Sequence, residues 1–315
     1  MANIKEYSEI PERLCGGHRL CGGCGASVAV RQVMMGAGKD TEVVAGCATG
    51  CLEVSTTALP YSSWNCSFIH NAFENVAATI SGVESAVKGL KRAGKLARDK
   101  QVKFVAFAGD GGTYDIGFQS LSGALERGHD FVFVCYDNGA YMNTGIQRSG
   151  ATPHYAWATT SETGKAIPGK LQQRKDLTSI VAAHRIPYAA QASIGDWKDL
   201  VSKAEKAFAV EGPAFLNVLA PCPRGWRYDG SQTIAISKLA FQTKFWPLFE
   251  IDHGKWSMKE VREAKVQPVE EFLEAQGRYK HLFKPTKRQD LIDQIQQEVD
   301  AYYDYIKKMC DTFGE

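Results

Sequence analysis

Short apolar runs alternate along the chain with segments in which apolar residues recur at helical spacing. The runs are rich in β-branched and aromatic residues and are bounded by Gly, Pro, Asp or Asn, which predicts strands at residues 42–45, 102–107, 131–136, 186–190 and 214–220. Helical spacing predicts helices over residues 116–127, with Asp115 as the N-cap, and over residues 196–208. Because parallel strands buried on both faces read as continuous apolar runs, this alternation predicts a doubly wound α/β fold with a mostly parallel sheet.

Two segments do not follow this alternation. Residues 145–174 are rich in Gly, Ser, Thr and Ala and have little periodicity, which is typical of a functional or interface loop that becomes ordered against another surface. From Trp256 onward the chain is charged and is predicted to be helical, with helical spacing of Leu291, Ile295, Val299, Tyr302 and Ile306. We therefore divide the chain into a domain of residues 1–255 and a helical C-terminal arm of residues 256–315, which is expected to contact the domain or a partner subunit.

Composition and charge exclude several classes of protein. The 37 basic and 35 acidic residues leave a net charge of +2, and no basic stripe with interleaved aromatic residues is present, so we expect no nucleic-acid partner. The N-terminus lacks the apolar segment of a signal peptide, and no apolar run approaches the length of a membrane span. We therefore expect a cytoplasmic protein, in which nine cysteines indicate metal binding rather than disulfides.

A carboxylate stands between glycines where the run 102–107 ends. Gly109, Gly111 and Gly112 would let the backbone approach a phosphate group, and the helix that follows would offer free amide groups to it. After the next run, about 28 residues beyond Asp110, comes the sequence Asp-Asn-Gly-Ala of residues 137–140. Asp110, the amide oxygen of Asn138 and the carbonyl oxygen of Ala140 would supply oxygen ligands of the kind that Mg²⁺ takes together with phosphate oxygens.

This pair of motifs has a simpler interpretation as two ordinary turns, because Asp, Asn and Gly dominate turns for local reasons. The pair nevertheless has the order of strand, Gly-Asp-Gly, helix, strand and Asn that is typical of the diphosphate and Mg²⁺ site of thiamine diphosphate enzymes. The segment matches neither the Gly-x-Gly-x-x-Gly fingerprint of dinucleotide binding nor the Gly-Lys-Ser/Thr end of a phosphate-binding loop of NTPases.

The cysteines form a second candidate site. Cys21 and Cys24 are spaced as Cys-x-x-Cys, a spacing shared by zinc and iron–sulfur sites. Two further ligands must come from the other cysteines, of which Cys222 is favoured because it follows a predicted strand end. The remaining candidates are Cys15, Cys47, Cys51, Cys66, Cys135 and Cys310. Cys135 is interpreted as a small core residue and Cys310 is discounted because it lies in the arm, whereas the choice between Cys47 and Cys51 stays open on spacing alone.

Seven motifs occur together and in order along the chain: CGGCGAS, CATGCLEVSTTALPYSSW, IHNAFEN, GDGGTYDIG, YDNGAYMNTGIQRS, ATP and APCPRGW. With them, residues from about 14 to 250 resemble the β subunits of pyruvate:ferredoxin oxidoreductase (pyruvate synthase), in the 2-oxoacid:ferredoxin oxidoreductase family. The resemblance implies thiamine diphosphate, Mg²⁺ and one 4Fe-4S cluster as cofactors of this subunit.

The resemblance also implies roles for individual residues. The implied cluster ligands are Cys21, Cys24, Cys51 and Cys222, which selects Cys51 over Cys47, and the implied Mg²⁺ ligands are Asp110, Asn138 and the Ala140 carbonyl. Asn143 and Thr144 match residues near the thiazolium ring and the substrate, and we assign them as catalytic. The remaining expected cofactor contacts are Thr49, Gly50, His70, Gly109, Gly111 and Gly112, with His70 expected to share a helix face with Glu74.

The implied function is oxidative decarboxylation of a 2-oxoacid, with pyruvate and coenzyme A as the first candidates and ferredoxin as the acceptor of single electrons. Because only one α/β domain is predicted, the domain that binds the aminopyrimidine ring is expected on another subunit. Two alternatives stay open: the same machinery acting on oxalate without coenzyme A, and a non-redox thiamine-dependent lyase whose cysteines hold structural zinc. A relay subunit with a degenerate thiamine site is hard to reconcile with the presence of both Asp110 and Asn138.

Overall fold

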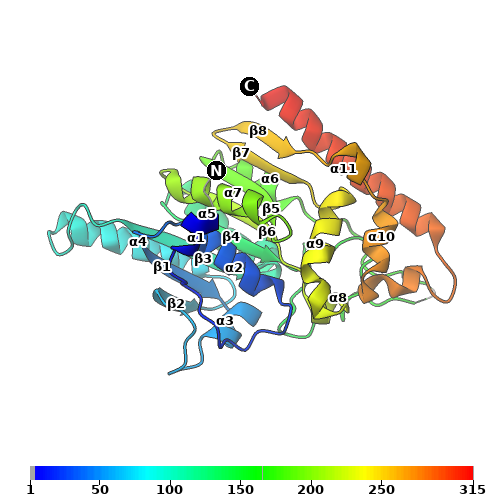
Figure 1. Ribbon diagram of the computed structural model, residues 1–315, viewed down its shortest axis with the longest axis horizontal. Helices are drawn as coiled ribbons and strands as arrows, with labels where there is room; N and C mark the ends of the chain where they lie inside the picture. The colour runs from blue at the N-terminus through cyan, green and yellow to red at the C-terminus, as the bar shows by residue number, and fades with distance from the viewer. Residues whose placement is uncertain (1–3, 165, 315) are drawn as a thin grey trace.

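The computed structural model describes residues 4–164 and 166–314, and within them eight strands form one sheet in the order β2-β1-β3-β4-β6-β5-β7-β8 (Figure 1). The first six strands in this order are parallel, and β7 and β8 are antiparallel. The strands are β1 (Glu42–Ala48), β2 (Ser67–Asn71), β3 (Val102–Gly109), β4 (Val132–Asp137), β5 (Tyr188–Ser193), β6 (Ala214–Leu219), β7 (Leu248–Asp252) and β8 (Lys255–Lys259).

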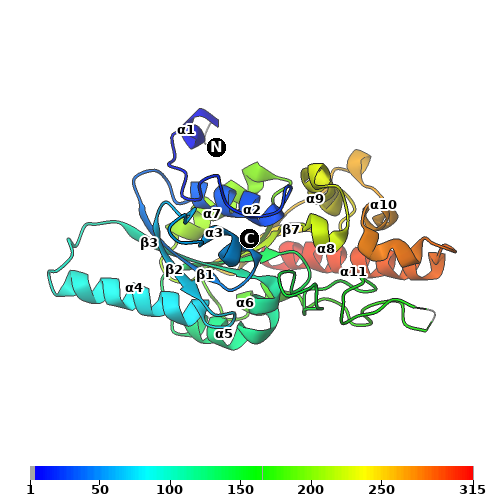
Figure 2. The ribbon, with the colours of Figure 1, turned by 90° about the horizontal axis from the view of Figure 1, so that it is seen from below.

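Helices cover both faces of the sheet. α2 (Gly25–Met35) and α7 (Trp197–Ala209) pack on one face, whereas α4 (Val76–Arg92), α5 (Phe118–Glu126) and α6 (Leu177–Ala182) pack on the other (Figure 2). A third apolar cluster joins α9 (Thr233–Gln242), α10 (Val269–Glu274) and α11 (Gln289–Phe313) at one end of the sheet. The remaining elements are short: α1 (Ile4–Ser8), α3 (Cys51–Thr56), η1 (Gly111–Ile116), α8 (Pro223–Trp226), η2 (Gly230–Gln232), η3 (Glu263–Lys265) and η4 (Gly277–Leu282). The predicted doubly wound α/β fold is confirmed.

The five predicted strands are all present as β1, β3, β4, β5 and β6, with ends that shift by up to three residues. The predicted helix after β3 begins earlier than expected, because the chain coils into the π-helix η1 directly after Asp110. The prediction of Asp115 as an N-cap is therefore wrong. Its carboxylate instead accepts a hydrogen bond from the backbone N–H of Gly150 (2.8 Å) and pairs with Lys175 (2.7 Å).

Three strands were not predicted. Residues 67–71 form β2, so the expected helix face shared by His70 and Glu74 does not exist. β7 and β8 form a hairpin through His253 and Gly254, which both have positive φ (50° and 84°), as a tight hairpin turn requires. The expectation of a helix from Trp256 onward is thus wrong at its start, because Trp256 lies in β8. The division into residues 1–255 and 256–315 stays a prediction.

The long helix α11 packs on its own chain. Its apolar side chains Leu291, Ile295, Val299 and Ile306 are buried. On the side of the loop 145–174, Glu298 pairs with His154 (2.9 Å), and the two segments lie side by side in Figure 2. The part of the loop around His154 is thus ordered against α11, as the sequence led us to expect. None of the described helices is both long and apolar enough to cross a lipid bilayer.

Candidate active site

The carboxyl ends of β1, β3 and β4 meet at one edge of the sheet. Cys47 is paired with Phe107 and Gly109 with Tyr136, so the three strands end level with one another. From β1 the strand order runs to β2 on one side and to β3 on the other, and ligands of doubly wound folds bind at such a reversal. A pocket opens there, lined by Thr49, Gly50, Cys51, Phe73, Gly109, Gly111, Gly112, Tyr136, Asn138, Ala140, Tyr141, Met142 and Asn143. The structure therefore brings most of the predicted cofactor contacts together.

Asp110 follows the last residue of β3, and its side chain is fully buried. Its Oδ1 accepts a hydrogen bond from the backbone N–H of Asn138 (3.2 Å), and its Oδ2 accepts one from the hydroxyl of Ser149. Burial, with a contribution from the nearby carboxylate of Asp137, raises the pKa of Asp110 to about 8. A carboxyl group in this environment is strongly favoured in its charged form only when a cation lies beside it.

The side-chain amide oxygen of Asn138 faces two other oxygen atoms and no donor. It lies 3.0 Å from Asp110 Oδ1 and 3.0 Å from the carbonyl oxygen of Ala140. Turning the amide over would let its NH₂ group donate to both oxygens, and a divalent cation among the three oxygens would satisfy them in the observed orientation. The chemistry of this donor set therefore fits the predicted Mg²⁺ site.

Buried donors hold the turn 138–140 in place. The indole N–H of Trp226 donates to the carbonyl oxygen of Asn138 (2.6 Å), and the hydroxyl of Thr152 donates to the carbonyl oxygen of Gly139 (2.7 Å). Two of the three consecutive carbonyl groups are thus engaged by the protein. The third, on Ala140, is the one that faces Asp110 and Asn138.

The glycines of the pocket allow close approach of the backbone. A Cβ atom at Gly111 would lie 2.3 Å from the ring of Tyr141, and one at Gly50 would lie 2.8 Å from the hydroxyl of Tyr136. Gly111 and Gly112 also open η1, and the first amide groups of a helix have no partner within it. The same stretch can therefore bring free N–H groups to an anionic ligand.

The two predicted catalytic residues and His70 lie in different surroundings. Asn143 lines the mouth of the pocket and is exposed. Thr144 is also exposed, but it is outside the lining, and its hydroxyl donates to the side chain of Gln147 (2.6 Å). His70 lies in β2, outside the lining, and its Nδ1 pairs with the buried carboxylate of Glu53 (2.7 Å). Of the three, Asn143 alone is placed to touch a ligand in this pocket.

Cys21, Cys24, Cys51 and Cys222 come from three distant parts of the chain and gather beside this pocket. Cys24 precedes α2, Cys51 begins α3 and Cys222 precedes α8. The backbone N–H of Gly25 donates a hydrogen bond to the carbonyl oxygen of Pro221 (3.1 Å), which joins the segments that carry Cys24 and Cys222. Burial raises the pKa of Cys24 to about 11 and that of Cys51 to about 12, and in both cases the neighbouring thiols of the group contribute.

The other cysteines lie elsewhere. Cys47 and Cys135 are buried inside β1 and β4, where they act as small core residues, whereas Cys51 lines the pocket. Among the residues that the structure describes, no three His, Cys, Asp or Glu side chains are close enough together to hold a single metal ion.

Sequence reasoning missed four side chains that build the site: Ser149, Thr152, Arg174 and Trp226. The first three lie in the loop 145–174, whose composition indicated a functional loop without indicating which side chains turn inward. Arg174 forms an ion pair with the buried carboxylate of Asp137 (2.7 Å). Trp226 belongs to the APCPRGW motif, so its presence near the site was a signal that could have been used.

Comparison with known proteins agrees with this geometry. The family model described as "Thiamine pyrophosphate enzyme, C-terminal TPP binding domain" matches residues 45–218, a stretch that runs from within β1 to within β6. Pyruvate synthase subunit PorB of Thermotoga maritima is 52% identical over 96% of this chain and 94% of its own length. Ketoisovalerate oxidoreductase subunit VorB of Pyrococcus furiosus is 42% identical over 99% of this chain and 98% of its own length.

A solved structure shares the fold. The 2-oxoglutarate:ferredoxin oxidoreductase from Magnetococcus marinus, with 2-oxoglutarate, coenzyme A and succinyl-CoA bound, aligns with a TM-score of 0.53 and 20% identity over 76% of this chain and 80% of that chain. The full-length similarity to PorB and the matched thiamine pyrophosphate domain show the family directly. The chain therefore belongs to the thiamine-dependent 2-oxoacid:ferredoxin oxidoreductases, as a subunit of the pyruvate synthase PorB type.

Proposed function

We propose that this chain is the catalytic, thiamine diphosphate-binding subunit of an enzyme that oxidatively decarboxylates pyruvate with coenzyme A and passes electrons singly to ferredoxin. One observation carries the proposal: Cys51 lines the same pocket as Gly109, Gly111 and Asn138. A cofactor bound along these glycines would therefore lie next to Cys51, one of the four proposed cluster ligands. The names of the PorB relatives support pyruvate as the substrate.

Asp110, Asn138 and the Ala140 carbonyl would hold Mg²⁺, and the amide groups at Gly111 and Gly112 would bind the diphosphate. The support is the convergence of Asp110 Oδ1 and the Ala140 carbonyl oxygen on the side-chain amide of Asn138, each 3.0 Å away, and the close approach that the glycines permit. When bound, thiamine diphosphate supplies the carbanion chemistry that removes the carboxylate of a 2-oxoacid. The task of the protein is to fix the diphosphate end, so that the reactive end is held at the pocket mouth.

Cys21, Cys24, Cys51 and Cys222 would hold a 4Fe-4S cluster, which supplies one-electron acceptance. The three thiols whose pKa is raised by burial, those of Cys24, Cys51 and Cys222, are neutral at pH 7 in the metal-free chain and must lose protons when they bind iron. The exposure of Cys21 leaves one side of the group open to a partner.

Asn143 is the residue that we assign to substrate, because its amide at the mouth of the pocket can donate a hydrogen bond to an oxygen on which negative charge develops. Thr144 and Gly145 beside it are exposed. The described residues form a single sheet, and the carboxylate that activates the aminopyrimidine ring is therefore assigned to a partner subunit that covers this mouth. We infer an obligate hetero-oligomer, in which the isolated chain does not oxidise a 2-oxoacid.

The test is anaerobic purification of the complete complex and of this chain alone, followed by assay of both against a panel of 2-oxoacids, with and without coenzyme A, reading viologen reduction. We expect brown material with bound thiamine diphosphate, and pyruvate oxidation that requires coenzyme A and the partner subunits. Full activity of the isolated chain would contradict the divided active site.

The same assay distinguishes the alternatives. Oxalate oxidation without coenzyme A would favour the oxalate enzyme, and colourless material with stoichiometric zinc would favour the non-redox lyase. Preference for a branched 2-oxoacid would place the chain with the VorB relative.

A further inference from the structure

Arg174 makes a buried ion pair directly behind the turn 138–140. Its Nη2 donates to Asp137 Oδ2 (2.7 Å) and to the hydroxyl of Tyr114 (2.6 Å), which itself donates to the same carboxylate oxygen (2.7 Å). Asn217 donates to that hydroxyl as well (2.9 Å). The side chain of Asp137 is 2% exposed, so Arg174 is its counter-ion in a place that water hardly reaches.

Asp137 connects this ion pair to the turn. Its Oδ1 accepts a hydrogen bond from the backbone N–H of Gly139 (3.1 Å), and its own backbone carbonyl accepts one from Ala220 (2.7 Å). Asp137 Oδ2 therefore accepts from Arg174, while Asp137 Oδ1 accepts from the backbone N–H at the centre of the turn 138–140. The same turn carries the Asn138 side chain and the Ala140 carbonyl that face Asp110.

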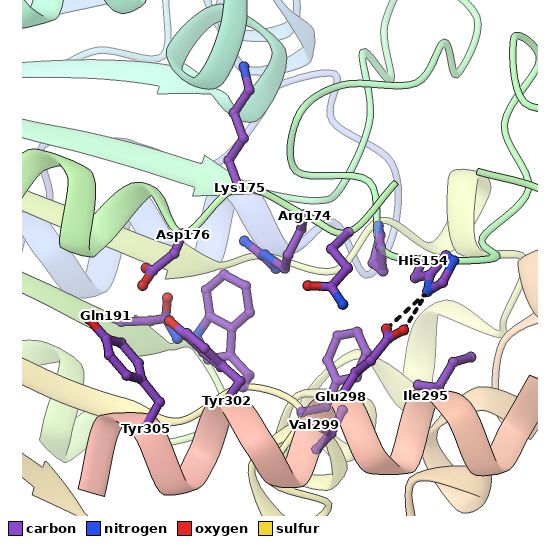
Figure 3. A pocket seen from close by; sticks show the side chains of 14 residues that line it. His154, Arg174, Lys175, Asp176, Gln191, Ile295, Glu298, Val299, Tyr302 and Tyr305 are labelled. Carbon is purple, nitrogen blue, oxygen red and sulfur yellow. Dashed lines mark hydrogen bonds and ion pairs between the residues drawn. The ribbon is translucent and has the colours of Figure 1, made fainter. Parts of the chain in front are cut away.

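The other face of Arg174 borders a pocket against α11 (Figure 3). Trp246 lies beneath the guanidinium group, with its ring centre 4.4 Å from the Arg174 Cζ atom, and α11 contributes Val299 and Tyr302 to the opposite wall. Among the charged side chains that line the pocket, His154 pairs with Glu298 and Lys175 pairs with Asp115, while Asp176 accepts a hydrogen bond from the backbone N–H of Ser179. The pocket therefore offers a small planar cation a route to the position of the Arg174 guanidinium group.

We propose that Arg174 is a positioning residue for the cofactor: through Asp137 it fixes the turn whose oxygens bind the cation of the bound diphosphate. The inference rests on the proposed function, because it assumes that Mg²⁺ and a diphosphate bind at Asp110. It assigns to the loop 145–174 the task of holding the cation site from behind, without contact with substrate.

The test compares the complete complex that contains the wild-type chain with complexes that contain Arg174→Ala or Arg174→Lys, by calorimetric titration with thiamine diphosphate and, separately, with inorganic pyrophosphate, both in Mg²⁺. We expect both ligands to bind about tenfold or more weakly to Arg174→Ala, the size of effect seen when a partner that orients a metal ligand is removed. Guanidinium chloride at low millimolar concentration should restore affinity by entering through the pocket, whereas methylammonium chloride at the same ionic strength should not. Arg174→Lys keeps the positive charge but lacks the planar set of N–H donors of a guanidinium group. We therefore expect its affinity for both ligands to lie between those of the wild type and Arg174→Ala.

Arg148→Ala is the matched control, because Arg148 lies in the same loop and is exposed, and within the described residues its guanidinium group donates only to the side chain of Gln172 (2.9 Å). It should bind both ligands as wild type does. Unchanged affinity in a folded Arg174→Ala, or in Arg174→Lys if the alanine variant does not fold, overturns the proposal. Failure of the wild-type complex to bind either ligand in Mg²⁺ would instead overturn the proposed function.

Discussion

Replacing Asp110 with Asn should make the cation-free chain more stable at neutral and alkaline pH, although it removes the group on which cofactor binding depends. The carboxyl group of Asp110 is fully buried, and burial beside Asp137 raises its pKa to about 8, against an ordinary value of 3.8. An Asn side chain has the same shape. It can still accept from the N–H of Asn138 and can meet the hydroxyl of Ser149 with its NH₂ group.

The sign and size of the effect follow from these pKa values. Because the folded pKa lies above the unfolded one, the folded chain binds an extra proton between about pH 4 and pH 8, and the free energy of unfolding falls as pH rises through that window. One pKa unit of difference between the folded and unfolded states corresponds to about 1.4 kcal/mol. At pH 7 the buried carboxyl group of Asp110 therefore lowers the free energy of unfolding of the cation-free chain by on the order of 4 kcal/mol. The Asn variant lacks this cost, and its advantage should vanish below pH 4.

The assay is urea unfolding of the metal-free wild-type chain and of Asp110→Asn at several pH values, with Tyr141→Phe as a control variant that keeps the carboxyl. When the free energy of unfolding is plotted against pH, the wild type and Asp110→Asn should have equal values near pH 4, and the difference between them should grow up to pH 8. Mg²⁺ with thiamine diphosphate at pH 8 should stabilise the wild type and leave the variant unchanged. Parallel curves at all pH values would refute the inferred burial of an ionisable carboxyl group at this position.

Further predictions concern the glycines and the cysteines. Gly111→Ala should abolish detectable thiamine diphosphate binding in calorimetry, because the added methyl group lies 2.3 Å from the ring of Tyr141, and the double variant with Tyr141→Ala should regain part of it. Cys51→Ser should lose the iron and the visible absorbance of the anaerobic protein, whereas Cys47→Ser should keep both, since Cys47 is buried within β1. Reconstitution of the chain with iron and sulfide should be faster at pH 9 than at pH 7, because burial raises the pKa of Cys24 to about 11 and that of Cys51 to about 12; equal rates would contradict it.

The central strands of the sheet could be predicted from the sequence, whereas the strands at its edges could not. β3 and β4 are buried on both faces, so they appear as continuous apolar runs that are easy to detect. β7 and β8 alternate apolar and polar residues around His253 and Gly254; from the sequence we predict no strand at residues 248–252 and place the chain from Trp256 onward in a charged helical arm. A hairpin signal was present there in the Gly that allows positive φ, but His at the preceding position is an uncommon residue for such a turn.

The candidate site shows the same division. Asp110, Asn138 and the glycines could be located from the sequence, because each directly follows a strand and therefore lies at the same edge of the sheet. Arg174 and Ser149 could not, because they reach that edge by the path of a long loop whose course depends on tertiary contacts. His70 was misplaced, because the short edge strand β2 has too few apolar residues to be separated from a helix by periodicity.

The position of β6 in the sheet has a consequence for how the protein is made. β6 lies between β4 and β5 in the sheet but follows both in the chain, so Cys222, which comes after β6, can join the other three thiols only after β4 and β5 have been synthesised. The nascent polypeptide therefore offers at most three of the four sulfurs until about seven-tenths of it has been synthesised. Under the proposed ligand assignment, delivery of iron would be a late event, and a chain that terminates before Cys222 would be expected not to retain the metal.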